Sequence, residues 1–257
     1  RLVRSPRLLE FLIRFKGVVV AGDYIFPRPA NMFVIARLLM IGDYGLASVK
    51  VTIPEGATTY EMATIIARLI PAFNREDVLA RAKPLEGYLF PDTYFFQPTW
   101  EPKRMIETME KRFRTATKSL TALIDRSGRT EEQVVIMASL LEREAATTES
   151  RRLIAGILWK RLDVGMPLQV DAVFPYIIGR NSFELSRNDL ATSSPYNTYR
   201  YRGLPIGPIA NPGLDALTAA LTPVESNYLF YLSDRSGTFH YAANFEGHKR
   251  NRIKYLP

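Results

Sequence analysis

The sequence of 257 residues contains no cysteine and only two histidines, His240 and His248. The absence of cysteine excludes disulfide bonds, thiolate catalysis and zinc sites with cysteine ligands. Two histidines are too few for a histidine-rich metal centre. We therefore expect neither a metal nor a cofactor.

The chain also lacks a long hydrophobic run. Its most apolar early segment, residues 8–22, is interrupted by Glu10, Arg14 and Lys16 and is too short to cross a bilayer. Glycine and proline are not in excess, so long disordered segments are not expected either. These absences leave an ordinary globular protein.

Acidic residues are outnumbered by basic ones, 26 to 34, which gives a net charge of +8. Such a balance favours an anionic partner, which could be nucleic acid, a membrane surface or the acidic matrix of a cell wall. The basic residues are scattered, and no zinc-finger, helix-turn-helix or RNA-recognition pattern accompanies them. Charge alone is therefore weak evidence for nucleic-acid binding.

Hydrophobic periodicity predicts an α+β fold, with a small α+β subdomain over residues 1–82 and a larger mixed domain over residues 83–257. The expected helices cover residues 2–16, 31–40, 58–70, 74–82, 102–117, 130–146, 150–162 and 215–221. The expected strands cover residues 18–26 and 49–53, residues 168–173 could form another, and a terminal hairpin pairs 228–232 with 238–242. Proline and glycine after the strands at 18–26 and 49–53 make a duplicated strand–turn–helix unit plausible.

The helix over residues 130–146 is the most informative element. Thr130 and Gln133 form a capping-box pattern at its start, and apolar residues then recur at helical spacing. Glu142 lies beside the apolar stripe, and its neighbours three and four positions away are small. Something could therefore approach its carboxylate, such as a substrate or another backbone.

Two interpretations of Glu142 remain open at this point. It is either a catalytic carboxylate or part of a buried structural helix, paired with an arginine. Glu144 is not an obvious catalytic partner for Glu142, because side chains two positions apart on a helix point about 200° away from each other. Any chemistry would then use a single glutamate or a polar group from elsewhere in the chain.

Other segments hold polar and aromatic residues in patterns that suggest binding. Gln169 and Asp171 share one face if residues 168–173 form a strand. The aromatic segment 85–96 could pack its rings into a core or offer them as a platform for sugars. Residues 203–213 are rich in glycine and proline, which indicates a rigid loop.

Five motifs follow one another along the chain in a specific order. They are EGYLFPDTY at 86–94, ASLLERE at 138–144, LQVD at 168–171, YNTY at 196–199 and GLPIGPI at 203–209. Together they resemble the endolytic murein transglycosylase family of bacterial cell-wall enzymes. The resemblance covers residues 85–257 well, whereas residues 18–82 resemble the family's LysM-like region only loosely.

The resemblance implies a lytic transglycosylase that cuts the β-1,4 bond between N-acetylmuramic acid and N-acetylglucosamine in nascent peptidoglycan. It also implies that residues 83–257 form the catalytic domain, on the extracytoplasmic (periplasmic) side of the bacterial inner membrane. A single-pass N-terminal anchor, absent from this chain, would hold it there. The implied partners are peptidoglycan strands and the penicillin-binding peptidoglycan synthases.

The family's catalytic glutamate maps onto Glu142 in this resemblance. A lytic transglycosylase uses the C6 hydroxyl of the substrate as its nucleophile, so one carboxyl group can act first as acid and then as base, whereas ordinary glycosidases need two carboxylates. Such an acid needs a raised pKa. The implied substrate-binding residues are Gln169, Asp171, Tyr196, Asn197 and Tyr199, each of which could instead tie a loop by a hydrogen bond.

The sequence departs from the family pattern around His240 and His248, so their roles stay open. A non-catalytic peptidoglycan-binding protein on the same scaffold is the alternative to an enzyme. It would keep every measurable property when Glu142 is replaced by glutamine.

Overall fold

The computed structural model describes residues 47–180 and 185–256 throughout. In the N-terminal part it describes residues 7, 9–11, 14, 19–20, 24–26, 28–43 and 45. The helix predicted over residues 2–16 and the strand predicted over residues 18–26 lie largely outside the described residues.

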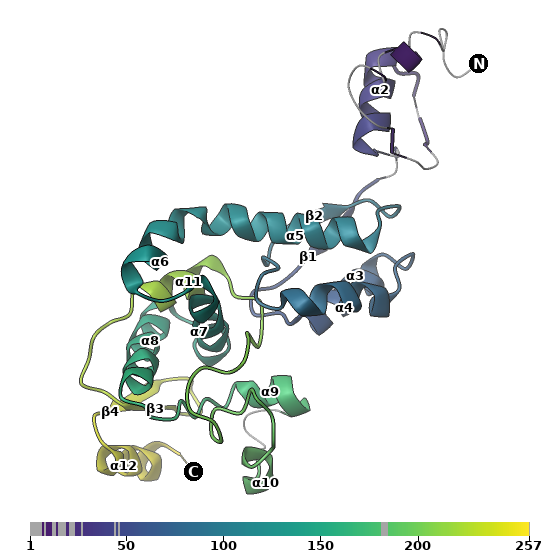
Figure 1. The fold of residues 1–257 in the computed structure, drawn as a ribbon. Helices are drawn as coiled ribbons and strands as arrows, with labels where there is room; N and C mark the ends of the chain where they lie inside the picture. Colours follow the sequence, from purple (N-terminus) through teal and green to yellow (C-terminus); the bar gives the residue numbers. More distant parts are fainter. Residues whose placement is uncertain are drawn as a thin grey trace.

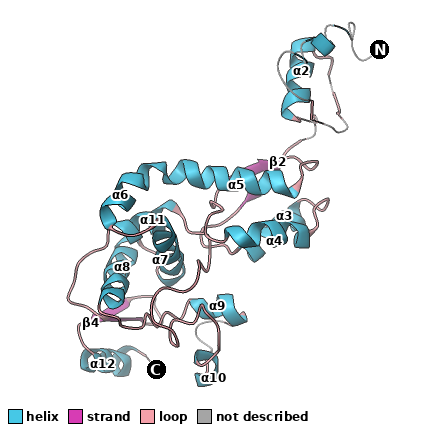
Figure 2. Cartoon of the chain, viewed as in Figure 1, coloured by secondary structure: helices cyan, strands magenta, loops and turns pink. Residues whose placement is uncertain are grey.

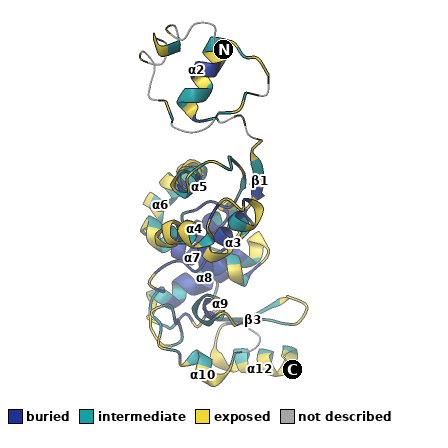
Figure 3. Ribbon diagram, turned by 90° about the vertical axis from the view of Figure 1, so that its right-hand side faces the viewer, coloured by how far each residue is buried: buried dark blue, intermediate teal, exposed yellow. Residues whose placement is uncertain are grey.

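Helix α2 (Met32–Ile41) stands apart from the rest of the molecule (Figure 1). The Asn31 side chain caps its first turn, and Gly42 ends it in the left-handed conformation. Arg104 donates a hydrogen bond to the carbonyl oxygen of Ile41 over 2.8 Å. Helices α2 and α12 lie at opposite ends of the molecule in both views (Figures 1 and 3).

The next unit is built on a two-stranded antiparallel sheet. Strand β1 (Val49–Thr52) pairs with β2 (Thr93–Phe96), so that Val49 faces Phe96. Between these strands the chain forms α3 (Thr59–Leu69), α4 (Arg75–Ala82) and the short 3-10 helix η1 (Lys83–Leu85). One hydrophobic cluster joins these elements to the first half of α5 (Pro102–Thr117).

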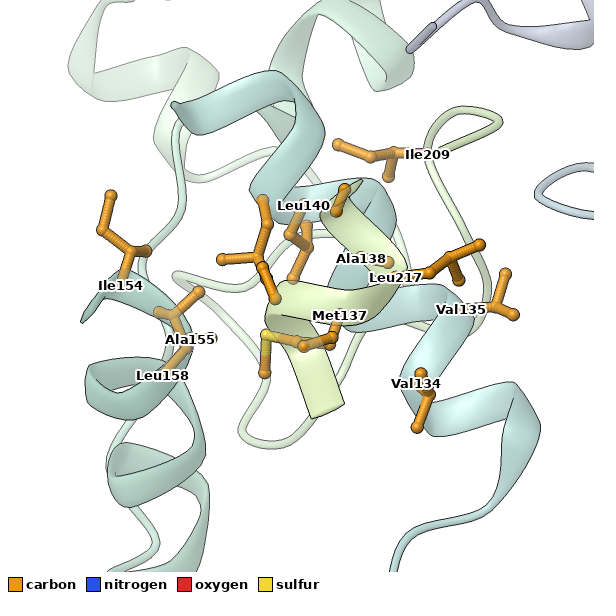
Figure 4. Close-up of a cluster of buried hydrophobic side chains, with 14 of the residues drawn as sticks. Val134, Val135, Met137, Ala138, Leu140, Ile154, Ala155, Leu158, Ile209 and Leu217 are labelled. Carbon is orange, nitrogen blue, oxygen red and sulfur yellow. The ribbon is translucent and has the colours of Figure 1, made fainter. Parts of the chain in front are cut away.

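A second cluster forms the centre of the larger part of the chain. Helix α5 leads through η2 (Lys118–Leu120) and α6 (Thr121–Ser127) to α7 (Glu131–Glu144), which packs on α8 (Thr148–Asp163) and α11 (Leu214–Leu221). Figure 4 shows α7 side chains such as Met137 and Leu140 among those of α8 and α11. Helices α7 and α8 show extensive buried stretches (Figure 3).

The remaining elements surround this centre. They are α9 (Val173–Ile178), α10 (Arg187–Leu190), the antiparallel hairpin of β3 (Phe230–Ser233) and β4 (Phe239–Ala242), and α12 (Phe245–Tyr255). Helices and a few short strands, joined by loops, make up the described chain (Figure 2). The predicted α+β class and terminal hairpin are thus confirmed, while helix α12 was not predicted.

Two local expectations change with the structure. Residues 168–173 are not a strand, because Gln169 has a φ of +49° and the chain turns into α9. The aromatic segment 85–96 contributes mainly to the core, where Leu89 and Phe96 are fully buried. Strand β2 and the start of α5 share a cluster with α3 and α4, and the domain boundary at residue 82 stays a prediction.

Candidate active site

Helix α7 carries two glutamates at its C-terminal end. Its capping box at Thr130 and Gln133 forms as predicted, and residues 134–141 are all buried. Because Glu142 and Glu144 project in different directions from this anchored helix, they meet different surroundings. Each must therefore be considered separately.

Glu142 is held in a buried ion pair. Its Oε1 accepts a hydrogen bond from Arg151 over 2.5 Å, and its Oε2 accepts one from the backbone N–H of Gly213 over 2.9 Å. The side chain of Glu142 is 4% exposed and that of Arg151 10% exposed. Arg151 also contacts Asp215 over 2.5 Å, so the pair ties α7, α8 and the start of α11 together.

Further contacts close the space around Glu142. A Cβ atom added to Gly56 would lie 3.2 Å from the Cγ of Glu142, and one added to Gly213 would lie 2.1 Å from Glu55. Burial raises the pKa of Glu142, whereas the Gly213 N–H and Arg151 oppose that rise. Both oxygens of Glu142 are engaged, one of them by a cation, which is the structural interpretation that the sequence left open. The catalytic role of Glu142 stays a prediction that this geometry does not favour.

Glu144 lies among neutral donors. Its Oε2 accepts a hydrogen bond from the Tyr231 hydroxyl over 3.0 Å, and its Oε1 accepts one from the backbone N–H of Ala172 over 3.3 Å. Burial, followed by the nearby charge of Asp171, raises its pKa to about 7. Glu144 is also the last residue of α7, where the negative end of the helix dipole disfavours a carboxylate. This carboxyl group can therefore hold a proton near neutral pH.

Asp171 is the second carboxylate of this cluster. Its Oδ1 accepts a hydrogen bond from the Tyr199 hydroxyl over 2.5 Å. Burial raises the pKa of Asp171, and this hydrogen bond opposes the rise. Burial and the Asp171 charge also raise the pKa of Tyr199, which keeps that hydroxyl protonated as a donor. The charge of Asp171 raises the pKa of Glu144, so the titrations of the two carboxyl groups are coupled.

The other three predicted binding residues, Gln169, Asn197 and Tyr196, lie in different surroundings. Gln169 is exposed two residues before Asp171, and among the described residues it is the one non-glycine residue with a positive φ. Such backbone strain often marks functional positions. Asn197 is buried and ties its own loop, since its side chain bonds to the carbonyls of Leu190 and Thr192 and to nearby backbone N–H groups. Tyr196 packs against Tyr176.

The structure thus brings Asp171 and Tyr199 together with Glu144, and separates Glu142 from them. Sequence reasoning missed Glu144 and Tyr231 as members of this site. The motif at 138–144 already contained Glu144, but nothing local indicated which glutamate meets neutral partners. Tyr231 belongs to a hairpin 87 residues further along the chain, so no spacing rule could have found its contact with Glu144.

A third buried glutamate lies at the junction between the two hydrophobic clusters. Glu86 is 7% exposed, and its carboxylate accepts hydrogen bonds from Thr59 and from the Asn211 side chain. Burial raises the pKa of Glu86 to about 7. The backbone at position 87 lies so close to Pro208 that this position requires glycine: its φ is +88°, and a Cβ there would lie 2.5 Å from Pro208. Glu86 thus joins segments of the chain by hydrogen bonds to α3 and the 203–213 loop.

The described residues offer little for metal binding. They contain no group of three or more histidine, cysteine, aspartate or glutamate side chains arranged to hold an ion. His240 instead pairs with Asp234 over 2.8 Å and stacks on Tyr255. Among the helices the structure describes, none has the length and hydrophobicity that a membrane span requires.

An α+β fold with a protonatable glutamate beside a second carboxylate contains the groups that acid–base chemistry by carboxyl groups requires. Comparison with known proteins gives the particular family. The model of the YceG-like family matches residues 1–254, and the chain belongs to that family.

Named relatives support the same assignment. The endolytic murein transglycosylase of Bacillus subtilis (strain 168) is 29% identical, over 99% of this chain and 78% of its own length. The endolytic murein transglycosylase of Streptococcus pneumoniae (serotype 2, strain D39) is 35% identical over 67% of this chain, which spans 32% of that relative. A crystal structure of a YceG-like protein from Listeria monocytogenes has a TM-score of 0.72 at 28% identity, covering 97% of this chain and 91% of the other.

Proposed function

We propose that this chain is an endolytic transglycosylase that cuts peptidoglycan between N-acetylmuramic acid and N-acetylglucosamine. Membership of the YceG-like family and the names of the relatives support an enzyme of the lyase class acting on peptidoglycan. The observation that carries the chemical step is Glu144, a carboxyl group held by neutral donors, with its pKa raised to about 7 beside Asp171.

In the proposed step, protonated Glu144 donates its proton to the glycosidic oxygen, and the bond between that oxygen and C1 of the muramic acid breaks. The C6 hydroxyl oxygen of the same sugar then bonds to C1, and its proton passes to the Glu144 carboxylate. The products are a 1,6-anhydro end and a new sugar hydroxyl, with no water consumed. Ionised Asp171, held by Tyr199, would stabilise the positive charge that develops at C1.

This proposal moves the acid–base role from Glu142 to Glu144 for a physical reason. The guanidinium of Arg151 holds one oxygen of Glu142, and donating a proton from there would require breaking a buried ion pair. Glu144 has no such partner among the described residues that hydrogen-bond to it. Gln169, Tyr196 and Asn197 remain proposed contacts to the sugar groups, with exposed Gln169 the best placed.

The deciding experiment is digestion of purified peptidoglycan followed by mass analysis of the fragment ends. We expect anhydro-ended fragments from the wild-type chain, a loss of about 10³-fold in Glu144→Gln, and retention in folded Glu142→Gln. Activity lost in folded Glu142→Gln and kept in Glu144→Gln would return the role to Glu142. Reducing ends would make the protein a hydrolase, and binding without cleavage would make it a non-catalytic wall protein.

We further propose the setting that the family resemblance implies. The enzyme would act outside the cytoplasmic membrane, held by a single-pass anchor and associated with penicillin-binding peptidoglycan synthases. The location of peptidoglycan supports the extracytoplasmic site, and the charge of +8 suits an anionic matrix. Fractionation of cells and co-purification of synthases with the tagged full-length protein test these points. Recovery in the cytosol without any synthase would contradict them.

A further inference from the structure

Arg161 is a buried arginine with no carboxylate partner recorded among the described residues. It lies near the end of α8, is 5% exposed and points its guanidinium at two backbone carbonyls. Its Nε donates to the carbonyl of Leu229 and its Nη1 to the carbonyl of Leu168, both over 2.6 Å. The guanidinium also lies 5.3 Å from the ring centroid of Phe230. One side chain therefore fixes two segments that are far apart in the sequence.

Both of these segments lead directly into the candidate site. Asp171 follows Leu168 by three residues, and Tyr231 follows Leu229 by two. Arg161 holds both carbonyls against α8, and α8 packs on α7, the helix that carries Glu144. The positions of Asp171 and Tyr231 relative to Glu144 accordingly depend on the two bonds of one guanidinium.

The positive charge of Arg161 also affects the pKa values of Glu144, Tyr199 and Tyr231. It lowers the pKa of Glu144 against the stronger effect of burial, and it likewise opposes the raised pKa values of Tyr199 and Tyr231. Burial lowers the pKa of Arg161 itself, yet a guanidinium stays charged throughout the physiological range. A fixed positive charge near the carboxyl pair thus limits how far their pKa values rise.

We propose that Arg161 is a positioning residue for the acid–base site, acting in two separable ways. Its forked hydrogen bonds place Asp171 and Tyr231 against Glu144, and its positive charge favours the ionised form of Glu144. The inference rests on the proposed function of Glu144, and it adds a residue that contacts neither substrate nor either carboxylate.

Two substitutions separate the roles. Arg161→Lys keeps the charge but cannot reproduce the planar fork, so we expect kcat to fall by about 10- to 100-fold with KM nearly unchanged and the alkaline limb of the pH profile in place. Arg161→Gln removes the charge as well, so the alkaline limb should also move to higher pH.

Arg152 provides a matched control on the same helix. Its Nε donates to the carbonyl of Thr222 over 2.7 Å, and it is exposed. We expect Arg152→Lys to change kcat by less than about threefold and to leave the pH profile unchanged. If both Arg161 variants keep kcat per folded molecule and keep the wild-type pH profile, the proposal is wrong and Arg161 is merely structural.

A second readout keeps this test independent of activity. The difference in unfolding free energy between the wild-type and Glu144→Gln proteins, followed from about pH 5 to pH 9, reports the midpoint of Glu144 titration. In the Arg161→Gln background that midpoint should rise, whereas in the Arg161→Lys background it should stay. An inactive wild-type chain with this shift would defeat the proposed function and preserve the electrostatic part of the inference, while no shift in a folded variant would overturn it.

Discussion

Glu142 and Glu144 are separated by one residue on the same helix, yet they lie in opposite kinds of surroundings. Glu142 is bonded to a buried guanidinium and ties three helices together. Glu144 is bonded to a tyrosine hydroxyl and a backbone N–H. Burial raises the pKa of both, but only a carboxyl group with neutral partners can give up and regain a proton without leaving a cation unpaired.

This comparison predicts that the largest effect is on catalysis. Glu144→Gln should reduce anhydro-product formation by about 10³-fold, equivalent to about 4 kcal/mol of transition-state stabilisation. The folded structure should remain, because the amide oxygen can still accept from the Ala172 N–H while the amide NH2 donates to the hydroxyl oxygen of Tyr231. Product formation within tenfold of the wild-type rate would remove Glu144 from the mechanism.

The next largest effect is on folding and belongs to Glu142. Replacing it with alanine leaves Arg151 buried with less compensation, so we expect a loss of about 3–5 kcal/mol in the free energy of unfolding, measured by urea denaturation. Arg143→Ala is the matched control, because Arg143 forms an exposed ion pair with Glu61 at the same end of α7. That change should cost less than about 1 kcal/mol. Equal losses in the two variants would contradict a special role for the buried pair.

A third effect concerns stability against pH. The pKa of Glu144 in the folded chain, about 7, exceeds its unfolded value of about 4.5. The folded state thus binds the proton more tightly, and stability falls as the pH rises from about 4.5 to 7, by up to about 3 kcal/mol. Glu144→Gln removes this contribution.

We expect Glu144→Gln to match the wild-type stability at about pH 5, within the effect of the amide itself, and to be more stable by about 1–3 kcal/mol at pH 8. Thermal or urea unfolding at the two pH values measures the difference. Glu86 also makes the stability depend on pH, since burial raises its pKa to about 7, but the wild type and Glu144→Gln share this dependence. If Glu144→Gln is no more stable than the wild type at pH 8, folding does not raise the pKa of Glu144 and the prediction is wrong.

The smallest predicted effect comes from Tyr231. Tyr231→Phe removes the hydroxyl that donates to Glu144 over 3.0 Å, which disfavours the carboxylate and raises the pKa of Glu144 further. The alkaline limb of kcat/KM should move to higher pH, and the rate should fall by less than about tenfold. Tyr228→Phe, on the same hairpin but exposed, should leave the profile unchanged. If the pH profile moves equally in both variants, the Tyr231 hydroxyl has no specific effect on the pKa of Glu144.

Much of the fold could be predicted from local signals. The capping box at Thr130 and the turn between β3 and β4 placed α7 and the hairpin within a few residues, and hydrophobic periodicity placed α3. A strand around Gln169 would place Gln169 and Asp171 on one face, but the segment does not form one. Its conformation is set instead by bonds to Thr198, from a part of the chain that periodicity does not report.

The site was harder to predict, because its chemistry depends on contacts between distant segments. Small neighbours on the helix drew attention to Glu142, and they do leave room, but Arg151 and the Gly213 backbone fill it. Asp171 and Tyr199 were predicted as binding residues and do lie beside a carboxyl group. That this group is Glu144 follows from the hairpin and α9, whose docking no local pattern specified.

The most direct test of the central claim is a ¹³C titration of the glutamate side-chain carboxyl groups by NMR. We predict a resonance with a midpoint near pH 7 that disappears in Glu144→Gln and persists in Glu142→Gln, while Glu86 gives a second resonance of this kind in both. The claim would be contradicted if Glu144→Gln kept every resonance that titrates near neutral pH and Glu142→Gln lost one.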